Sequence, residues 1–404
     1  MRNSNHKSLI AYSLFDFANS AFTLIFHAYL FPLYLYQFVF KPGTNSDLAW
    51  GILLSASALI SVLAGPFAGR WADRNGRWKV FSIIAVASFL SGLVLSIFIG
   101  QSNWQILGAF LVANSLFYLA ANLYNSLLGS LVTGSEKVSF SGFAWGFGYL
   151  GGILCFIGVF FFQNSFGLNS KIPYLFTSLF YSFFGVLSLM LLRRPLLLAR
   201  GRPKVTLREM FAALNKDRVG LLLGYFLIAD TIGAVISFTA LYASQELRLS
   251  TNTIGGFLLG VQLLAFPFTY LVCRVAMRHG TVRILAGCVA IWICILLLFV
   301  IRVNLAGMFL VTILTALVIG STQALMRSHY SDLLEKERDS ELFGWYGIAT
   351  ESAAVIAPLV FGLTAFTFDS KRLAMGLLII PLCFGFGLVA IYSRKLAARQ
   401  IGAT

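Results

Sequence analysis

The chain has 404 residues, of which 58% are hydrophobic and only 11% are charged. Soluble domains carry about 25% charged residues, so this composition excludes a soluble globular protein and indicates a polytopic membrane protein. The net charge of +15 would suit nucleic-acid binding, but the basic residues gather in short segments between apolar runs. This placement indicates a membrane topology signal, and no nucleic-acid partner is expected.

Residues 9–38 form the first of twelve expected transmembrane spans, because about 20 apolar residues cross a bilayer. Asp16 is the only formal charge in this run, and Asn19, Thr23 and His27 follow it at helical spacing on one face. A carboxylate in hydrocarbon costs roughly 2.5–3.5 kcal/mol, so we expect this face to meet partner helices or a wet cavity. The alternative is that Asp16 only hydrogen-bonds neighbouring backbone, and for His27 we favour simple packing.

The other expected spans are 47–69, 80–100, 105–132, 139–163, 172–192, 219–244, 254–276, 282–302, 306–326, 342–366 and 373–393. If both termini are cytoplasmic, the inner segments hold 24 of the 30 Lys and Arg residues, as the positive-inside rule requires. The basic segment 193–218 then links a half at 1–192 to a half at 219–404. The five cysteines show no metal-binding spacing, so neither metal nor cofactor is expected.

An internal repeat supports this division into halves. Arg70, Arg74, Gly76 and Lys79 return 204 residues later as Arg274, Arg278, Gly280 and Arg283. Each half also opens with a span that carries one acid, Asp16 in the first and Asp230 in the seventh. The predicted fold is therefore all-α, with twelve transmembrane helices in two pseudo-symmetric six-helix halves. This plan resembles that of the major facilitator transporters, whose substrate site lies between the halves near mid-membrane.

The loop after the second span carries the most specific motif of this superfamily. Its Gly69, Asp73, Arg74, Gly76 and Arg77 match the signature GxxxDRxGRR, while a tryptophan replaces its last arginine. Glycine permits the tight turn, and charge-assisted contacts among the acid and the arginines can break and reform. The resemblance implies a conformational switch that favours the outward-facing state; a short basic loop alone would be only a topology signal.

Four further stretches resemble the vacuole effluxer (autophagy-22-like) family, in the right order along the chain. They are Phe15–Phe22 (FDFANSAF), Ser141–Gly152 (SGFAWGFGYLGG), Gly320–Ser328 (GSTQALMRS) and Glu341–Tyr346 (ELFGWY). The seventh span departs from the family, because Ala229 and Thr231 flank Asp230 where an Asn-Asp-Gly step is usual. Met326 also replaces the usual serine.

The resemblance implies export of amino acids or similar small metabolites by alternating access, in a bacterial inner-membrane member. The bias of the basic residues predicts that both termini are cytoplasmic. The acids within the spans are Asp16, Asp230 and Glu351. No Lys or Arg is placed deep enough to pair with them, and burial favours their neutral form, so each is a candidate proton carrier. The expected substrate or proton path comprises Asp16, Asn19, Thr23, Tyr118, Asn122, Asn125, Tyr149, Asp230, Gln323, Arg327 and Glu351.

Several alternatives stay open at this point. Gln323 and Arg327 could serve as a gate or an end-cap, Glu351 could face water without titrating, and sodium could replace protons. A second function is efflux of amphipathic compounds such as drugs or a siderophore. An enzyme is not expected, because no catalytic motif is present, and we expect a monomer. The GxGxxG match at Gly146–Gly151 lies inside an apolar span, so it is not a dinucleotide-binding fingerprint. Gly142xxxGly146 and Gly148xxxGly152 indicate close helix packing instead.

Overall fold

The computed structural model describes residues 2–40, 46–131, 136–198, 215–301, 303–333, 345–347, 349–350 and 353–402. All regular elements in these ranges are helices. The first span combines α1 (Arg2–Phe22), the π-helix η1 (Thr23–Ala28), α2 (Leu30–Tyr34) and the π-helix η2 (Leu35–Val39). It is followed by α3 (Ser46–Asn75), α4 (Arg77–Phe98), α5 (Asn103–Leu131), α6 (Glu136–Phe166) and α7 (Ile172–Leu198).

The second set of helices begins after residue 214. It comprises α9 (Lys216–Gln245), α10 (Thr251–His279), α11 (Thr281–Val300), α12 (Leu305–Asp332), α14 (Ala357–Phe368), α15 (Lys371–Leu377) and α16 (Ile379–Gly402). Eleven stretches of the described chain are long and apolar enough to cross a bilayer. The expected linker 193–218 is shorter in the structure, since α7 runs to Leu198 and α9 starts at Lys216; residues 199–214 lie outside the described ranges.

The expected span 342–366 is discontinuous. Residues 354–356 form bends, and the helix α14 starts only at Ala357. Pro358 stands in the first turn of α14, where its missing backbone N–H costs no intrahelical hydrogen bond, so it is suited to a helix start at this point. The result is an outer half-helix of 12 residues, whose first backbone N–H groups need partners outside the helix.

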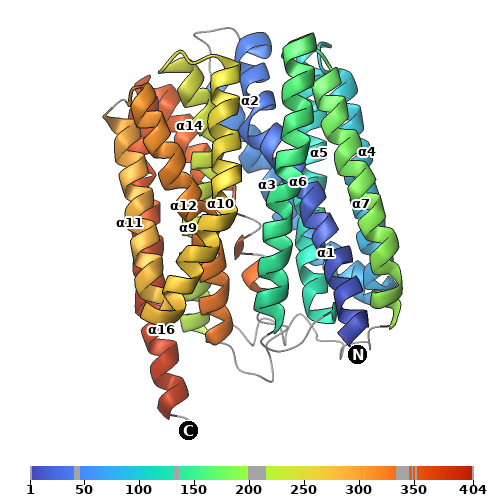
Figure 1. Ribbon diagram of the computed structural model, residues 1–404, viewed down its shortest axis with the longest axis vertical. Helices are drawn as coiled ribbons and strands as arrows, with labels where there is room; N and C mark the ends of the chain where they lie inside the picture. The colour runs from blue at the N-terminus through green and yellow to red at the C-terminus, as the bar shows by residue number, and fades with distance from the viewer. Residues whose placement is uncertain are drawn as a thin grey trace.

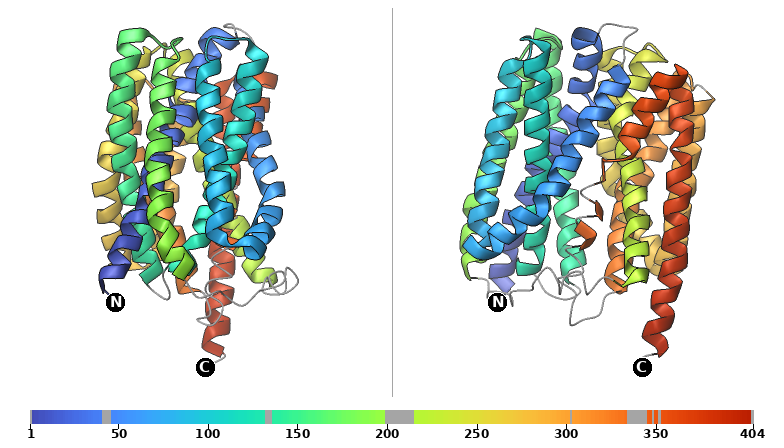
Figure 2. Two further views of the ribbon diagram at one scale, coloured as in Figure 1. Left: turned by 90° about the vertical axis from the view of Figure 1, so that its right-hand side faces the viewer. Right: turned by 180° about the vertical axis from the view of Figure 1, so that it is seen from behind.

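The helices form two groups that pack in the same way. In the first group α1 packs against α7 and α3 against α5, and in the second α9 packs against α16 and α10 against α12. Figures 1 and 2 show the two groups side by side, with both chain ends at one end of the molecule. We call that end the inner end and the opposite one the outer end. Across the groups, α3 packs against α14 and α6 against α10.

The repeated loop has one backbone geometry in both copies. Gly76 joins α3 to α4 with φ +96° and ψ 124°, and Gly280 joins α10 to α11 with φ +92° and ψ 134°. A side chain is strained at such positive φ values, which explains why glycine stands at both positions. The sequence repeat is therefore also a structural one.

Glycines of α6 allow two other helices to approach closely, as the sequence indicated. A Cβ built on Gly151 would lie 2.1 Å from the carbonyl oxygen of Phe17 in α1. One built on Gly148 would lie 2.7 Å from the Ser20 hydroxyl, and one on Gly146 would lie 2.8 Å from the ring of Phe266 in α10. The absence of side chains here thus brings α6 against both α1 and α10.

Candidate functional site

The inner half of the first span carries the polar side chains that were expected to face partner helices. Asp16 is partly buried in α1 and interacts with the phenol of Tyr124 from α5. Asn19 lies one turn further on, and its buried Oδ1 has no hydrogen-bond partner in the described part of the chain. Thr23 donates its hydroxyl proton to the carbonyl oxygen of Asn19 at 3.1 Å. Asp16 is therefore held within the first group of helices.

The expected continuous polar face ends at the π-helix. In a π-helix the backbone bonds run from i to i+5, which changes the angular spacing of the side chains. His27 is buried, and its Nε2 lies 2.6 Å from Oδ1 of Asn114 in α5. The rings of Phe22, Phe117 and Tyr118 surround this pair. His27 is thus packed and hydrogen-bonded, the interpretation that the sequence favoured, and Tyr118 contacts it.

The asparagines of α5 are not equivalent. Asn122 donates from Nδ2 to the Ser61 hydroxyl of α3 at 3.2 Å, while its buried Oδ1 has no partner among the described residues. Asn125 lies nearer the inner end and approaches Gly347, where a glycine Cβ would come 3.7 Å from the Asn125 Cβ. Asn125 therefore contacts the second group of helices.

Tyr149 of α6 faces the second group at the position where α10 and α12 meet. A Cβ built on Gly320 of α12 would lie 2.6 Å from the Tyr149 hydroxyl and 2.3 Å from Oγ1 of Thr269 in α10. Both hydroxyl oxygens are buried and have no partner among the described residues. Oε1 of Gln262, which lies two turns before Thr269 on the same face of α10, is also buried without a partner among the described residues. Such groups require hydrogen bonds from water or from a bound molecule.

A cavity of about 270 Å³ lies between α6, α10 and α12. Its lining includes Gln323, Arg327 and Trp145, and the Arg327 guanidinium lies 5.7 Å from the centre of the Trp145 ring. Arg327 is the only charged residue among the described residues that line it. The cavity can therefore accept an anionic group that is attached to an apolar or aromatic body.

Asp230 lies halfway along α9 and is 1% exposed. Its Oδ2 accepts a hydrogen bond from the backbone N–H of Ala357 at 2.7 Å, which is the first residue of α14. The carboxylate thus satisfies the start of the discontinuous helix, where the helix dipole also favours a negative charge. Its other oxygen, Oδ1, is buried without a partner in the described chain. Glu351, the third expected acid, lies outside the described residues.

The expected path residues therefore divide into those that lie at the junction of the two groups and those held inside one group. Tyr149, Gln323, Arg327 and Asn125 lie at the junction, whereas Asp16 and Asp230 each contact their own group. The sequence reasoning missed Gln262 and Thr269. Gln262 is an amide within an apolar run, so the argument applied to Asp16 would have found it, and Thr269 follows on the same helical face.

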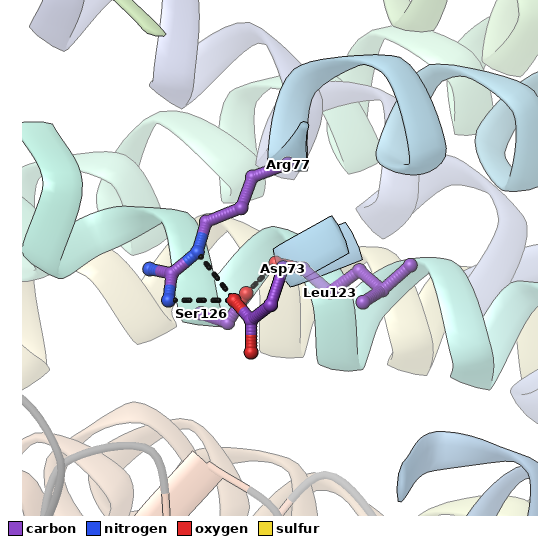
Figure 3. A network of polar contacts seen from close by, with 4 residues as sticks. All are labelled: Asp73, Arg77, Leu123 and Ser126. Atoms are coloured by element: carbon purple, nitrogen blue, oxygen red, sulfur yellow. Dashed lines mark hydrogen bonds and ion pairs between the residues drawn. The ribbon is translucent and has the colours of Figure 1, made fainter. Parts of the chain in front are cut away.

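The motif loop lies at the inner end, between α3 and α4. Arg77 donates from both Nε and an Nη group to Oδ1 of Asp73, at 3.2 and 3.0 Å, and Figure 3 shows this pair together with Leu123 and Ser126 of α5. Asp73 and Arg74 are exposed, and no atom lies within 4 Å of a Cβ built on Gly69 or Gly76. The ion pair therefore lies within the loop in this conformation.

The outer end is closed by polar contacts between the groups. The Tyr29 hydroxyl donates to the backbone oxygen of Thr251 at 3.1 Å, and Trp50 Nε1 donates to that of Ser237 at 3.2 Å. Asp47 of α3 forms an ion pair with Lys371 of α15 at 3.4 Å. These contacts separate the interior polar groups from the outer surface.

Two solved transporter structures share this fold. The human organic anion transporter MFSD10 has a TM-score of 0.67 at 15% identity, covering 95% of this chain and 99% of that one. A bacterial homologue of the human lysosomal transporter Spinster, in an inward-facing and occupied conformation, has a TM-score of 0.68 at 13% identity, covering 96% of each chain. The two packed groups of helices therefore have the fold of the major facilitator transporters, which are multi-pass membrane proteins.

The sequence relatives specify the family. The profile described as vacuole effluxer Atg22 like matches residues 48–401, and the chain belongs to this family. It is 24% identical over 400 residues to the uncharacterized MFS-type transporter YxiO of Bacillus subtilis, covering 93% of this chain and 92% of that protein. It is also 21% identical over 204 residues to autophagy-related protein 22 of Candida glabrata, covering 47% of this chain and 37% of that one.

Proposed function

We propose that the protein moves a small zwitterionic metabolite of the amino-acid type across a bacterial inner membrane by alternating access, coupled to protons. The observation that carries this proposal is the set of buried polar atoms without partners that face the junction from both groups. Tyr149 belongs to the first group, and Thr269 and Gln262 belong to the second. A polar substrate would satisfy both sides at once, whereas an apolar one would leave them desolvated and unpaired.

The charges of the site match a zwitterion. Arg327 provides a cation for a substrate carboxylate at the cavity. Acceptor oxygens without partners, on Asn19, Asn122 and Gln262, are suited to a substrate ammonium. In this proposal the carboxylate end lies toward α12, and the ammonium end lies toward α1 and α5. The proposed transporter is a monomer. Its termini lie in the cytoplasm, in agreement with the bias of its basic residues.

Asp230 is the proposed coupling residue. A proton on its Oδ1 would leave the bond from Ala357 to Oδ2 in place and would turn an acceptor into a donor toward the interior. Protonation would therefore change the polarity of the site without removing the start of α14. Asp16 is a second proposed carrier, placed beside Tyr124. Carboxylate and amide oxygens also bind sodium, so the experiment below includes a sodium gradient.

The motif loop is the proposed conformational switch. With the outer end closed, the Asp73–Arg77 pair lies within the loop and the glycine surface at Gly69 is open. In the opposite state the other group of helices would pack on this surface and Asp73 would exchange partners. The loop would then stabilise the state that opens outward.

A second function is efflux of amphipathic organic anions. The cavity supports it, because Trp145, Met277 and Ala324 give an apolar lining around the single charge of Arg327. The solved relative MFSD10 is an organic anion transporter. Such a substrate would use Arg327 and Trp145 but not the acceptor oxygens of α1 and α5.

Thermal unfolding of the purified protein in detergent tests both functions. The screen covers amino acids, peptides, organic acids, siderophores and amphipathic drugs at two pH values, since a ligand of the native state raises stability by RT ln(1 + [L]/Kd). A selective shift by amino acids, followed by uptake into proteoliposomes driven by a pH gradient, supports the first proposal. Shifts by many unrelated amphipathic anions support the second. Uptake that follows a sodium gradient and ignores pH contradicts proton coupling.

A further inference from the structure

A second cavity lies in the second group of helices, apart from the polar path. It has a volume of about 510 Å³ and lies where α11, α12 and α16 meet near the inner end. In Figure 1 these three helices lie at the left of the molecule, and α16 continues downward to the C-terminus. The described residues that line it include Arg283, Ala286, His329, Phe386, Ala390 and Arg394.

The rim of this groove is basic. Arg283 lies in the first turn of α11 and Arg394 lies in the inner part of α16, so both guanidinium groups belong to the inner membrane surface. Both are exposed, and neither forms an ion pair in the described chain. No carboxylate is among the described residues that line the cavity. The groove therefore presents two cations to a single ligand.

The wall below the rim is apolar. Ala286, Phe386 and Ala390 lie one to two turns further from the inner end than the arginines. The polar groups of the floor are already paired, because Nε2 of buried His329 lies 2.7 Å from the Ser393 hydroxyl. Hence the floor needs no water, and the groove offers an apolar slot beneath a pair of charges.

The lipids of the bilayer lie next to this apolar slot and can cover it. Ile380, Phe384 and Ile391 of α16 are 64%, 59% and 52% exposed, so this helix borders lipid. We propose that the groove binds one anionic phospholipid, with its phosphate between Arg283 and Arg394 and an acyl chain along Phe386 and Ala390. Basic pockets between helices at the cytoplasmic surface are suited to such headgroups. This site is independent of the transported substrate.

Native mass spectrometry of the full-length protein in neutral detergent tests this site. The probes are phosphatidylglycerol, phosphatidylcholine of the same chains, and inorganic phosphate. We expect phosphatidylglycerol to bind best, and each arginine near a membrane surface contributes about five-fold in affinity. Arg283→Gln combined with Arg394→Gln should therefore lower its affinity by about 25-fold. Arg194→Gln, an exposed arginine in α7, is the matched control and should change nothing.

Three results would overturn the proposal. Equal retention of the two lipids would show that charge is not recognised. Binding of inorganic phosphate with the same affinity as phosphatidylglycerol would assign the arginines to a free anion. An equal loss of phosphatidylglycerol affinity in the Arg194 variant would show only a surface-charge effect. Thermal unfolding without lipid checks folding; if the double variant is unstable, the single variants, each expected to lose about five-fold, are compared instead.

Discussion

Asp230 shows how one residue can serve both structure and transport. Its two carboxylate oxygens have different environments, since Oδ2 accepts from Ala357 while Oδ1 has no partner in the described chain. An asparagine can keep the first contact but cannot carry a proton. An alanine loses both properties, so the two substitutions separate the structural contribution from the proposed coupling.

We expect Asp230→Asn to fold and bind substrate but to lose uptake driven by a pH gradient. Asp230→Ala should in addition lower the free energy of unfolding by about 1.5–3 kcal/mol, because it removes a charged acceptor from a buried N–H. Thermal unfolding and proteoliposome uptake measure the two effects. Normal pH-driven uptake by the asparagine variant would exclude Asp230 as the coupling residue.

Gly320 should be essential because its missing side chain leaves room for two hydroxyl groups. Gly320→Ala places a Cβ 2.3 Å from Thr269 Oγ1 and 2.6 Å from the Tyr149 hydroxyl, so these groups must move apart. We expect a loss of substrate affinity of at least about ten-fold, equivalent to about 1.4 kcal/mol. Gly256→Ala in α10, where no atom lies within 4 Å, is the control. Unchanged affinity in the Gly320 variant would remove this cluster from the site.

At the scale of helices, α6 has the central position because it contacts both α1 and α10. Its glycines determine how closely these helices approach, and helix association in lipid depends on such packing more than on hydrophobic burial. Gly151 is the closest contact, and its neighbour is the backbone of Phe17, which cannot rotate away. This contact therefore predicts a stability effect without a direct effect on the polar path.

Gly151→Ala should lower the free energy of unfolding by about 1–3 kcal/mol, the usual cost of overpacking. Its control is Gly108→Ala in α5, where a Cβ would meet no atom within 4 Å. The two variants are compared by unfolding in a denaturing detergent, with the fraction of retained helix as the measured signal. Equal free energies of unfolding in the two variants would show that α1 and α6 can move apart without a loss of stability.

For the whole molecule, the described contacts fasten the two groups of helices at the outer end. The Asp47–Lys371 pair connects them there, whereas the nearby Glu246–Arg372 pair lies within the second group alone. Only the first pair must break when the outer end opens. Neutralising the acid of either pair removes one negative charge. Only the change at the Asp47–Lys371 pair should shift the equilibrium toward the state that is open at the outer end.

We expect Asp47→Asn to increase the outward-open population about two- to five-fold, the range of a weakly exposed ion pair. Glu246→Gln should leave it unchanged. Labelling of Ser55→Cys by a membrane-impermeant maleimide, in a background without the native cysteines, reports this opening, since Ser55 is buried within α3. Equal labelling rates in the two variants would show that the Asp47 pair does not control closure.

The sequence by itself determined the features that depend on local composition. Apolar length predicted the membrane spans, the repeat at Gly76 and Gly280 predicted two related halves, and the motifs from Phe15 onward predicted the family. These inferences succeed because hydropathy, turn conformation and motif spacing are properties of neighbouring residues. The packing role of the α6 glycines was predictable for the same reason.

Only the tertiary structure decided which polar groups meet. His27 pairs with Asn114, Asp230 with Ala357, and Tyr149 approaches Thr269. In each case the partner comes from another helix, so its place depends on how helices rotate and cross, which spacing along one chain does not specify. The π-helix after Phe22 and the break before Ala357 also redirect side chains at mid-membrane. The sequence could therefore identify the polar residues but not their partners.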